Sequence, residues 1–276
     1  MSATDTTAGG GEAGRAMAPA FFVSHGSPMV ALDSDAYTRA LRAFGESAGP
    51  VRARVVVSAH WETHGEVRVT AAESPEIIYD FGGFPEPLYR LKYPARGSPA
   101  LARDIVRRLQ EAGVGAALDA ERGWDHGTWI PLRLAWPEPG TMPVVQVSLP
   151  RGASAADVVR MGQALRPLRA QGVLLIGSGS LTHNLRQLDF HHKAAATAGW
   201  AEAFDAWVGG KLATGDFAGM ESWRDAPNSR LAHPSDEHLL PIFFVLGAAL
   251  PEDRVTPVYE GFHHASLSMR SFALRG

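Results

Sequence analysis

Four histidines in this chain each lie at the boundary of an apolar run, and histidine is the commonest metal ligand among protein side chains. They are His25 after residues 21–24, His60 after 55–59, His183 after 174–177 and a Ser/Gly turn, and His238 before 239–250. Imidazoles delivered from separate elements can converge on one cation. The spacing therefore predicts a metal site built by the tertiary fold.

The segments that would position these histidines alternate between strand-like apolar runs and amphipathic helical patterns. This alternation predicts an α/β fold: a single domain with a central mostly parallel or mixed sheet, flanked by helices on both faces. In open sheets of this class, ligands bind beyond the carboxyl ends of the strands. We therefore expect the histidines to meet at that edge.

The clearest predicted helix covers 98–113, with Ser98 as its cap and Gly113 as its terminator. Further predicted elements are a strand over 142–149, a helix over 155–170 bent near Pro167, a strand over 173–176, a helix over 194–212 and a helix beginning near His238. The last expectation places His238 at an exposed helix start, because Pro241 suits a first turn.

Composition limits the function classes. The 276 residues are 45% hydrophobic and 20% charged, with a net charge of −3 and no Lys/Arg run, so we expect neither a nucleic-acid nor a membrane partner. Residues 1–18 are predicted to be a disordered tail and 19–276 the catalytic domain, in a cytoplasmic protein. Cysteine is absent, so a metal site must use His, Asp or Glu.

Two local patterns favour other chemistry only superficially. His60 and His64 are four apart, as in zinc proteases, but Glu62 is misplaced for a general base and the context is not helical. His64 is therefore assigned to the surface. The loop at 177–184 lacks the lysine of a phosphate-binding loop and the spacing of a hydrolase serine.

Two loops rich in Gly, Pro and aromatic residues, 79–87 and 123–129, could wall a pocket for a flat ring. Phe81, Phe84 and Trp124 are the candidate substrate-binding residues. His126 could be either a core imidazole bonded to backbone or an acid/base in the pocket. The remaining histidines lie in polar or connecting stretches and are expected to be solvated: His191, His192, His233, His263 and His264.

Six ordered motifs between Phe21 and Met269 resemble the class III extradiol ring-cleavage dioxygenases, and more narrowly their 4,5-DOPA dioxygenase branch. They are Ser24-His25-Gly26-Ser27-Pro28, Ser58-Ala59-His60-Trp61, Asp80-Phe81-Gly82-Gly83-Phe84-Pro85, Asp125-His126-Gly127, Thr182-His183-Asn184-Leu185 and Glu237-His238-x-x-Pro241. Together they cover nearly everything except the predicted tail.

The resemblance implies that His25, His60 and His238 bind a non-haem metal, with His183 as acid/base or additional ligand and His126 contacting substrate. It implies Fe(II)-dependent insertion of both atoms of O2 into a DOPA-like catechol, giving a ring-opened semialdehyde. The wider class commonly uses a glutamate as third ligand, a place that His238 takes here unless neighbouring Glu237 does. A three-histidine set also suits Zn(II).

Two other functions are open on these residues. A zinc hydrolase could use the same histidines, with His183 or Glu237 as the base for an activated water. A non-catalytic metal-binding protein could keep the scaffold without the chemistry. The small-molecule partners expected from the leading hypothesis are a catechol and O2, and the oligomeric state is not predicted.

Overall fold

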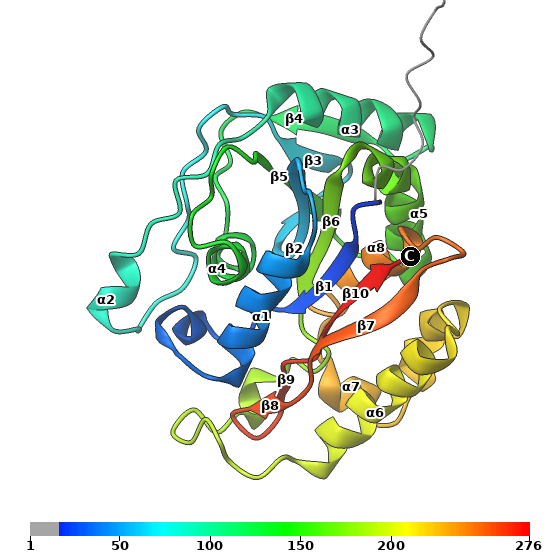
Figure 1. The fold of residues 1–276 in the computed structure, drawn as a ribbon. Helices are drawn as coiled ribbons and strands as arrows, with labels where there is room; N and C mark the ends of the chain where they lie inside the picture. Colours follow the sequence, from blue (N-terminus) through cyan, green and yellow to red (C-terminus); the bar gives the residue numbers. More distant parts are fainter. Residues whose placement is uncertain (1–16) are drawn as a thin grey trace, which may run out of the picture.

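An eight-stranded sheet runs through the part of the chain that the computed structural model describes, residues 17–276 (Figure 1). Its order is β4-β3-β5-β2-β6-β1-β10-β7. The strands are β1 (Ala20–Ser24), β2 (Ala53–Thr63), β3 (Val67–Thr70), β4 (Ala116–Asp119), β5 (Val144–Pro150), β6 (Val173–Gly179), β7 (Arg254–Tyr259) and β10 (Ser271–Arg275). A two-stranded hairpin, β8 (Phe262–His263) and β9 (Leu267–Ser268), stands apart from the sheet.

The four central strands β5, β2, β6 and β1 are mutually parallel, whereas β3 and β10 join them antiparallel. Residues 20–24 of β1 and 173–176 of β6 are buried throughout, as expected for strands covered on both faces. In register, Ser24 lies beside Gly179 and Ser58 beside Ser178. The carboxyl ends of these three strands therefore meet at one edge, which is where ligands bind in such sheets.

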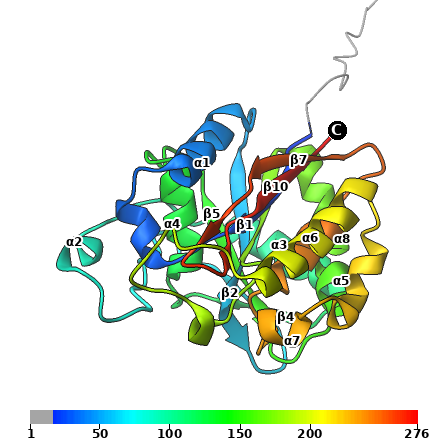
Figure 2. The same ribbon diagram turned by 90° about the horizontal axis from the view of Figure 1, so that it is seen from below.

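Helices cover both faces of the sheet (Figures 1 and 2). The core on one face contains residues of α3, α5, α6 and α8, and the core on the other contains residues of α1 and α4. The helices are α1 (Ala36–Ser47), α2 (Glu86–Tyr89), α3 (Pro99–Glu111), α4 (His126–Ala135), α5 (Ala155–Leu165), α6 (Gly199–Thr214), α7 (Ser229–Ala232) and α8 (Pro241–Gly247), with 3-10 turns η1 (Pro28–Leu32), η2 (Arg166–Gln171), η3 (Leu185–Gln187) and η4 (Ala218–Asp225). The predicted fold class is confirmed.

One predicted helix matches closely, and two others differ at one end. Ser98 caps α3 by accepting a hydrogen bond from the amide of Leu101, as its spacing predicted. The predicted helix over 155–170 stops at Leu165 and tightens into η2, because Pro167 cannot donate the backbone hydrogen bond that an α-helix needs. The predicted start at residue 194 was wrong: α6 begins at Gly199, and the amide of Ala198 instead bonds to Ala265.

The predicted exposed helix start at His238 was also wrong. Helix α8 begins at Pro241, and His238 lies in the preceding turn, where it is buried. The expected end of a strand at His60 needs a similar correction, because β2 continues to Thr63.

A fully buried ion pair lies where the two ends of the described part of the chain meet. Arg169 of η2 contacts Asp253 through two hydrogen bonds of 2.5 and 2.8 Å and donates further bonds to backbone carbonyls, including those of Ala18 and Leu274. The predicted tail lies outside the described residues up to position 16. Within the described part, none of the helices is long and apolar enough to cross a membrane.

Candidate metal centre

His25 leaves β1 through a turn that requires glycine. The backbone of Gly26 has φ +70°, and a Cβ there would lie 2.5 Å from the methyl carbon of Met269. The turn aims the His25 ring over the carboxyl ends of the parallel strands. This placement agrees with the prediction from the Ser24-His25-Gly26 sequence.

His60 is aimed by an irregularity in β2. Its pairing with β5 is regular up to Val57 and resumes only at Glu62, and the amide of His60 donates to the hydroxyl of Ser58 at 3.2 Å. Bulged segments of this kind redirect side chains near functional sites. Packing is tight here, because a Cβ on Gly127 would lie 2.6 Å from Ser58 Oγ and 2.9 Å from His60 Cδ2.

His238 reaches the same point from the turn before α8. Its carbonyl accepts a hydrogen bond from Ser180, just beyond β6, at 2.8 Å. A Cβ on Gly179 would lie only 2.1 Å from that carbonyl oxygen, so this approach needs glycine.

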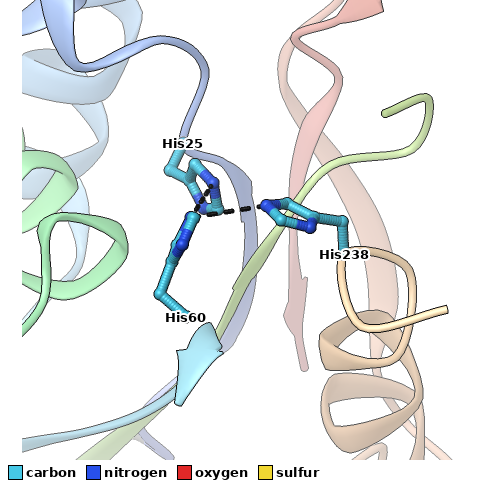
Figure 3. Close-up of side chains that lie close together, drawn as sticks. All are labelled: His25, His60 and His238. Atoms are coloured by element: carbon cyan, nitrogen blue, oxygen red, sulfur yellow. Dashed lines mark hydrogen bonds between the residues drawn. The ribbon is translucent and has the colours of Figure 1, made fainter. Parts of the chain in front are cut away.

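The three imidazoles converge through their Nε2 atoms (Figure 3). His60 Nε2 lies 3.1 Å from His25 Nε2 and 3.3 Å from His238 Nε2. Ligand atoms of all three residues lie within 4.8 Å of one another. The three residues predicted to share a metal are therefore brought together.

The outer ring nitrogens indicate which tautomers are present. Ser178 Oγ donates to the carbonyl of Gly127 at 2.5 Å, so at 3.0 Å it can only accept from His25 Nδ1. Glu237 Oε1 lies 2.9 Å from His238 Nδ1 and likewise accepts a proton from it. Both Nε2 atoms therefore present lone pairs to the shared point, the arrangement that a bound metal needs.

Burial keeps these imidazoles uncharged. The pKa of His25 and that of His238 lie well below the usual histidine value, first because of burial and then because of neighbouring histidines. Burial and His126 lower the pKa of His60 to about 3. Neutral imidazole is the metal-binding form, so the electrostatics fit a dication at this point.

Two other groups of side chains could hold an ion, namely His60 with Asp80 and His126, and His183 with Glu237 and His238. In both groups, the carboxylate already accepts a hydrogen bond from a histidine. Asp80 accepts from the amide of His126 at 2.8 Å, and Glu237 contacts His238 on the side of the ring away from the shared point. The three-histidine set is therefore the best-supported ligand set.

His183 and His126 flank this set. The His183 ring stacks on His238 with centroids 3.4 Å apart, and burial lowers its pKa to about 4. The His126 ring lies 4.0 Å from that of His60, and its Nδ1 is 3.0 Å from Asp80 Oδ1, outside hydrogen-bonding geometry. Both rings line the cavity above the three ligands, and the neutral His183 imidazole can accept a proton there.

A cavity of about 400 Å³ opens above the histidines. Phe81 and Phe84 line it, as their loop predicted. The rings of Phe81 and His126 are in edge contact, with their centroids 5.6 Å apart. Trp124 does not reach it: this side chain is completely buried in the core beside α4 and is absent from the lining. Removing this large, mostly apolar indole from water favours its place in the core.

The other histidines divide into three groups, the first of which is His264 alone, half-buried with its Nδ1 donating to the carbonyl of Asp189 at 3.0 Å. His64, His191 and His192 are exposed, as expected. The expectation of solvated side chains was wrong for His233 and His263, which are 3% and 6% exposed. His233 Nε2 donates to the carbonyl of Leu181 at 2.8 Å, a partner that offsets its burial.

Residues 19–272 match the family model described as the catalytic LigB subunit of aromatic ring-opening dioxygenase. The chain belongs to the LigB family. Membership confirms the class III extradiol dioxygenase family predicted from the six motifs, and with it the expected enzyme class.

Relatives of this LigB-family chain include 4,5-DOPA dioxygenase extradiol proteins. The protein from Escherichia coli K12 is 40% identical over 92% of this chain and 93% of its own length, and that from Beta vulgaris is 38% identical over 91% and 94%. The crystal structure of an uncharacterized E. coli K12 protein superposes with a TM-score of 0.79 at 36% identity, covering 93% of this chain and 99% of the other.

Sequence reasoning missed the residues that complete the site. Ser178 and Asp80 hold histidines, and Leu188 forms part of the wall together with Leu185 and Phe190. The Asp80-Phe81 motif offered a signal for Asp80. The segment 185–190 has no helical or strand periodicity, although Asn184 caps η3 by accepting a hydrogen bond from the amide of Arg186. Its position over the histidines depends on tertiary contacts with the β8–β9 hairpin, such as that of Asp189 with His264.

Proposed function

We propose that this protein is an Fe(II)-dependent extradiol dioxygenase that inserts both atoms of O2 into a catechol and releases a ring-opened semialdehyde acid. The observation that carries the proposal is the convergence of three neutral imidazoles, two with their Nδ1 protons held by Ser178 and Glu237, beneath an aromatic-walled cavity. Membership of the LigB family and its ring-opening description support the same chemistry.

When bound, Fe(II) at His25, His60 and His238 would supply the redox chemistry that lets O2 react with an aromatic ring. Three neutral ligands leave the full double positive charge on the ion, which favours an anionic catecholate. His183, neutral and facing the cavity, accepts a proton from the catechol and later returns it. Phe81 and Phe84 exclude water and hold the ring, and His126, whose ring contacts that of Phe81, contacts substrate beside them.

The test is anaerobic reconstitution with Fe(II), followed by mixing with catechols and air while O2 uptake and a new visible absorption are recorded. We expect one O2 consumed per ring opened, with ¹⁸O from labelled O2 at both new positions. His183→Ala should retain iron while losing 10²-fold or more in turnover. No uptake with iron demonstrably bound, or zinc-supported hydrolysis of an ester without O2, would contradict the proposal.

A further inference from the structure

The opening of the cavity is lined by apolar residues that the metal chemistry does not require. Leu185 and Phe190 are 55% and 60% exposed, although both line the opening. Leu188 and Leu267 also line the cavity, as do Phe81 and Phe84. Exposed apolar side chains that border a cavity commonly mark a surface that a ligand covers.

Charged groups that could hold a charged substituent are already paired. Among the described residues, neither lysine nor arginine lines the cavity, and Asp80 is its sole carboxylate. Asp80 accepts the amide proton of His126 and lies 3.7 Å from His60 Nδ1, so its charge is used within the site.

Two cations of adjoining segments are engaged elsewhere, and a third lies in solvent. Lys193 pairs with Asp33 and Asp35, each at 2.5 Å. Arg122 donates to the carbonyl of His60 at 3.2 Å and lies over the Trp61 ring. Arg186 is exposed and outside the lining. A substrate carboxylate that left water for the cavity wall would find no cation in the lining, which is costly, and a pair with the solvent-exposed Arg186 would compensate for little of that cost.

Resting on the function proposed above, we infer that the substrates are catechols with an uncharged, apolar substituent, and that catechol amino acids and acids are disfavoured. The hydroxyl groups face the histidines, and the substituent lies along Leu188, Leu185 and Phe190. Each methylene buried there raises kcat/KM up to about fourfold. This specificity differs from the DOPA named for several relatives.

The experiment compares kcat/KM of the Fe(II)-loaded protein for 4-methylcatechol, 4-butylcatechol, 3-(3,4-dihydroxyphenyl)propionate, DOPA and dopamine. Because the mouth is partly open, we expect about tenfold preference for the butyl over the methyl compound, and tenfold or more over each charged one. Equal values, or preference for any charged compound, would overturn the inference.

Binding to the zinc-loaded protein keeps this test separate from that of the proposed function, because zinc performs no redox chemistry. Calorimetry should give the same order of affinities even if no catechol consumes O2. If the iron-loaded protein turns over none of the compounds, only the dioxygenase proposal is refuted. If the zinc-loaded protein binds them in a different order of affinity, only the inferred substrate class is refuted.

A matched pair of variants tests the wall directly. Leu185→Arg places a cation at the mouth and should shift the butyl-to-propionate ratio of kcat/KM toward the propionate by tenfold or more. Leu118→Arg changes a leucine that is 38% exposed on the edge strand β4, outside the cavity, and should leave the ratio unchanged. An unchanged ratio in Leu185→Arg would contradict the inferred path of the substituent.

Discussion

Replacing Ser178 by alanine should weaken metal binding without removing any ligand. The Ser178 hydroxyl is completely buried, accepts the Nδ1 proton of His25 at 3.0 Å and donates to the Gly127 carbonyl at 2.5 Å. Without it, His25 Nδ1 loses its acceptor and the tautomer with a proton on Nε2 is no longer disfavoured. Loss of such outer partners typically costs about 10- to 100-fold in metal affinity, or about 1.4–2.8 kcal/mol.

The assay is competition for Co(II) or Zn(II) between the protein and a chelating dye, with unfolding measured in parallel. Ser229→Ala is the matched control, because Ser229 is also buried and donates to a backbone carbonyl, that of Arg224, at 2.7 Å. We expect both variants to lose about 1 kcal/mol or more of stability, and Ser178→Ala alone to lose metal affinity. Wild-type affinity in Ser178→Ala, or an equal loss in the control, would refute the tautomer argument.

Three further predictions concern packing and charge. Gly127→Ala should lower metal affinity because the Cβ of the introduced alanine has no room between α4 and β2. Gly210→Ala, in open space on α6, should leave metal affinity unchanged. Dye competition measures the metal affinity of both variants. Asp253→Ala should lower the free energy of unfolding in urea by about 3–5 kcal/mol, because it leaves Arg169 buried and unpaired; a loss below 1 kcal/mol would show that the backbone carbonyls suffice. Burial lowers the pKa of His233 to about 4. The contribution of its neutral ring to the free energy of unfolding is therefore complete above about pH 6.5 and is lost as pH falls toward 4. In metal-free protein, protonation of His233 lowers the free energy of unfolding by about 2 kcal/mol at pH 5. Urea titrations across this pH range should show a smaller pH dependence in His233→Gln. An unchanged pH profile in that variant would contradict the prediction.

The sequence predicted the parts of the site that local patterns determine. His25 follows an unbroken apolar strand and precedes a glycine turn, so its position at a strand end could be read directly. His60 was placed correctly in space but not in its element, because the bulge in β2 arises from the packing of Ser58 and Gly127 against it.

The remaining parts depend on contacts distant in sequence. His238 was expected to be exposed because Pro241 suggested a helix that starts near it. The helix begins three residues later, and the burial of His238 arises from packing against the end of β6. Trp124 looked suited to a substrate wall, yet aromatic composition alone does not distinguish a cavity wall from the core beneath it. The apolar mouth at 185–190 is held by the β8–β9 hairpin, about 75 residues away in sequence.

The central claim is that His25, His60 and His238 hold one metal ion. Anomalous X-ray diffraction from Co(II)-loaded crystals tests it most directly. We predict a single strong peak about 2.0–2.2 Å from each of the three Nε2 atoms, the distance typical of imidazole ligands. A peak at Asp80 and His126 instead, or none between the three rings in protein that demonstrably contains metal, would contradict it.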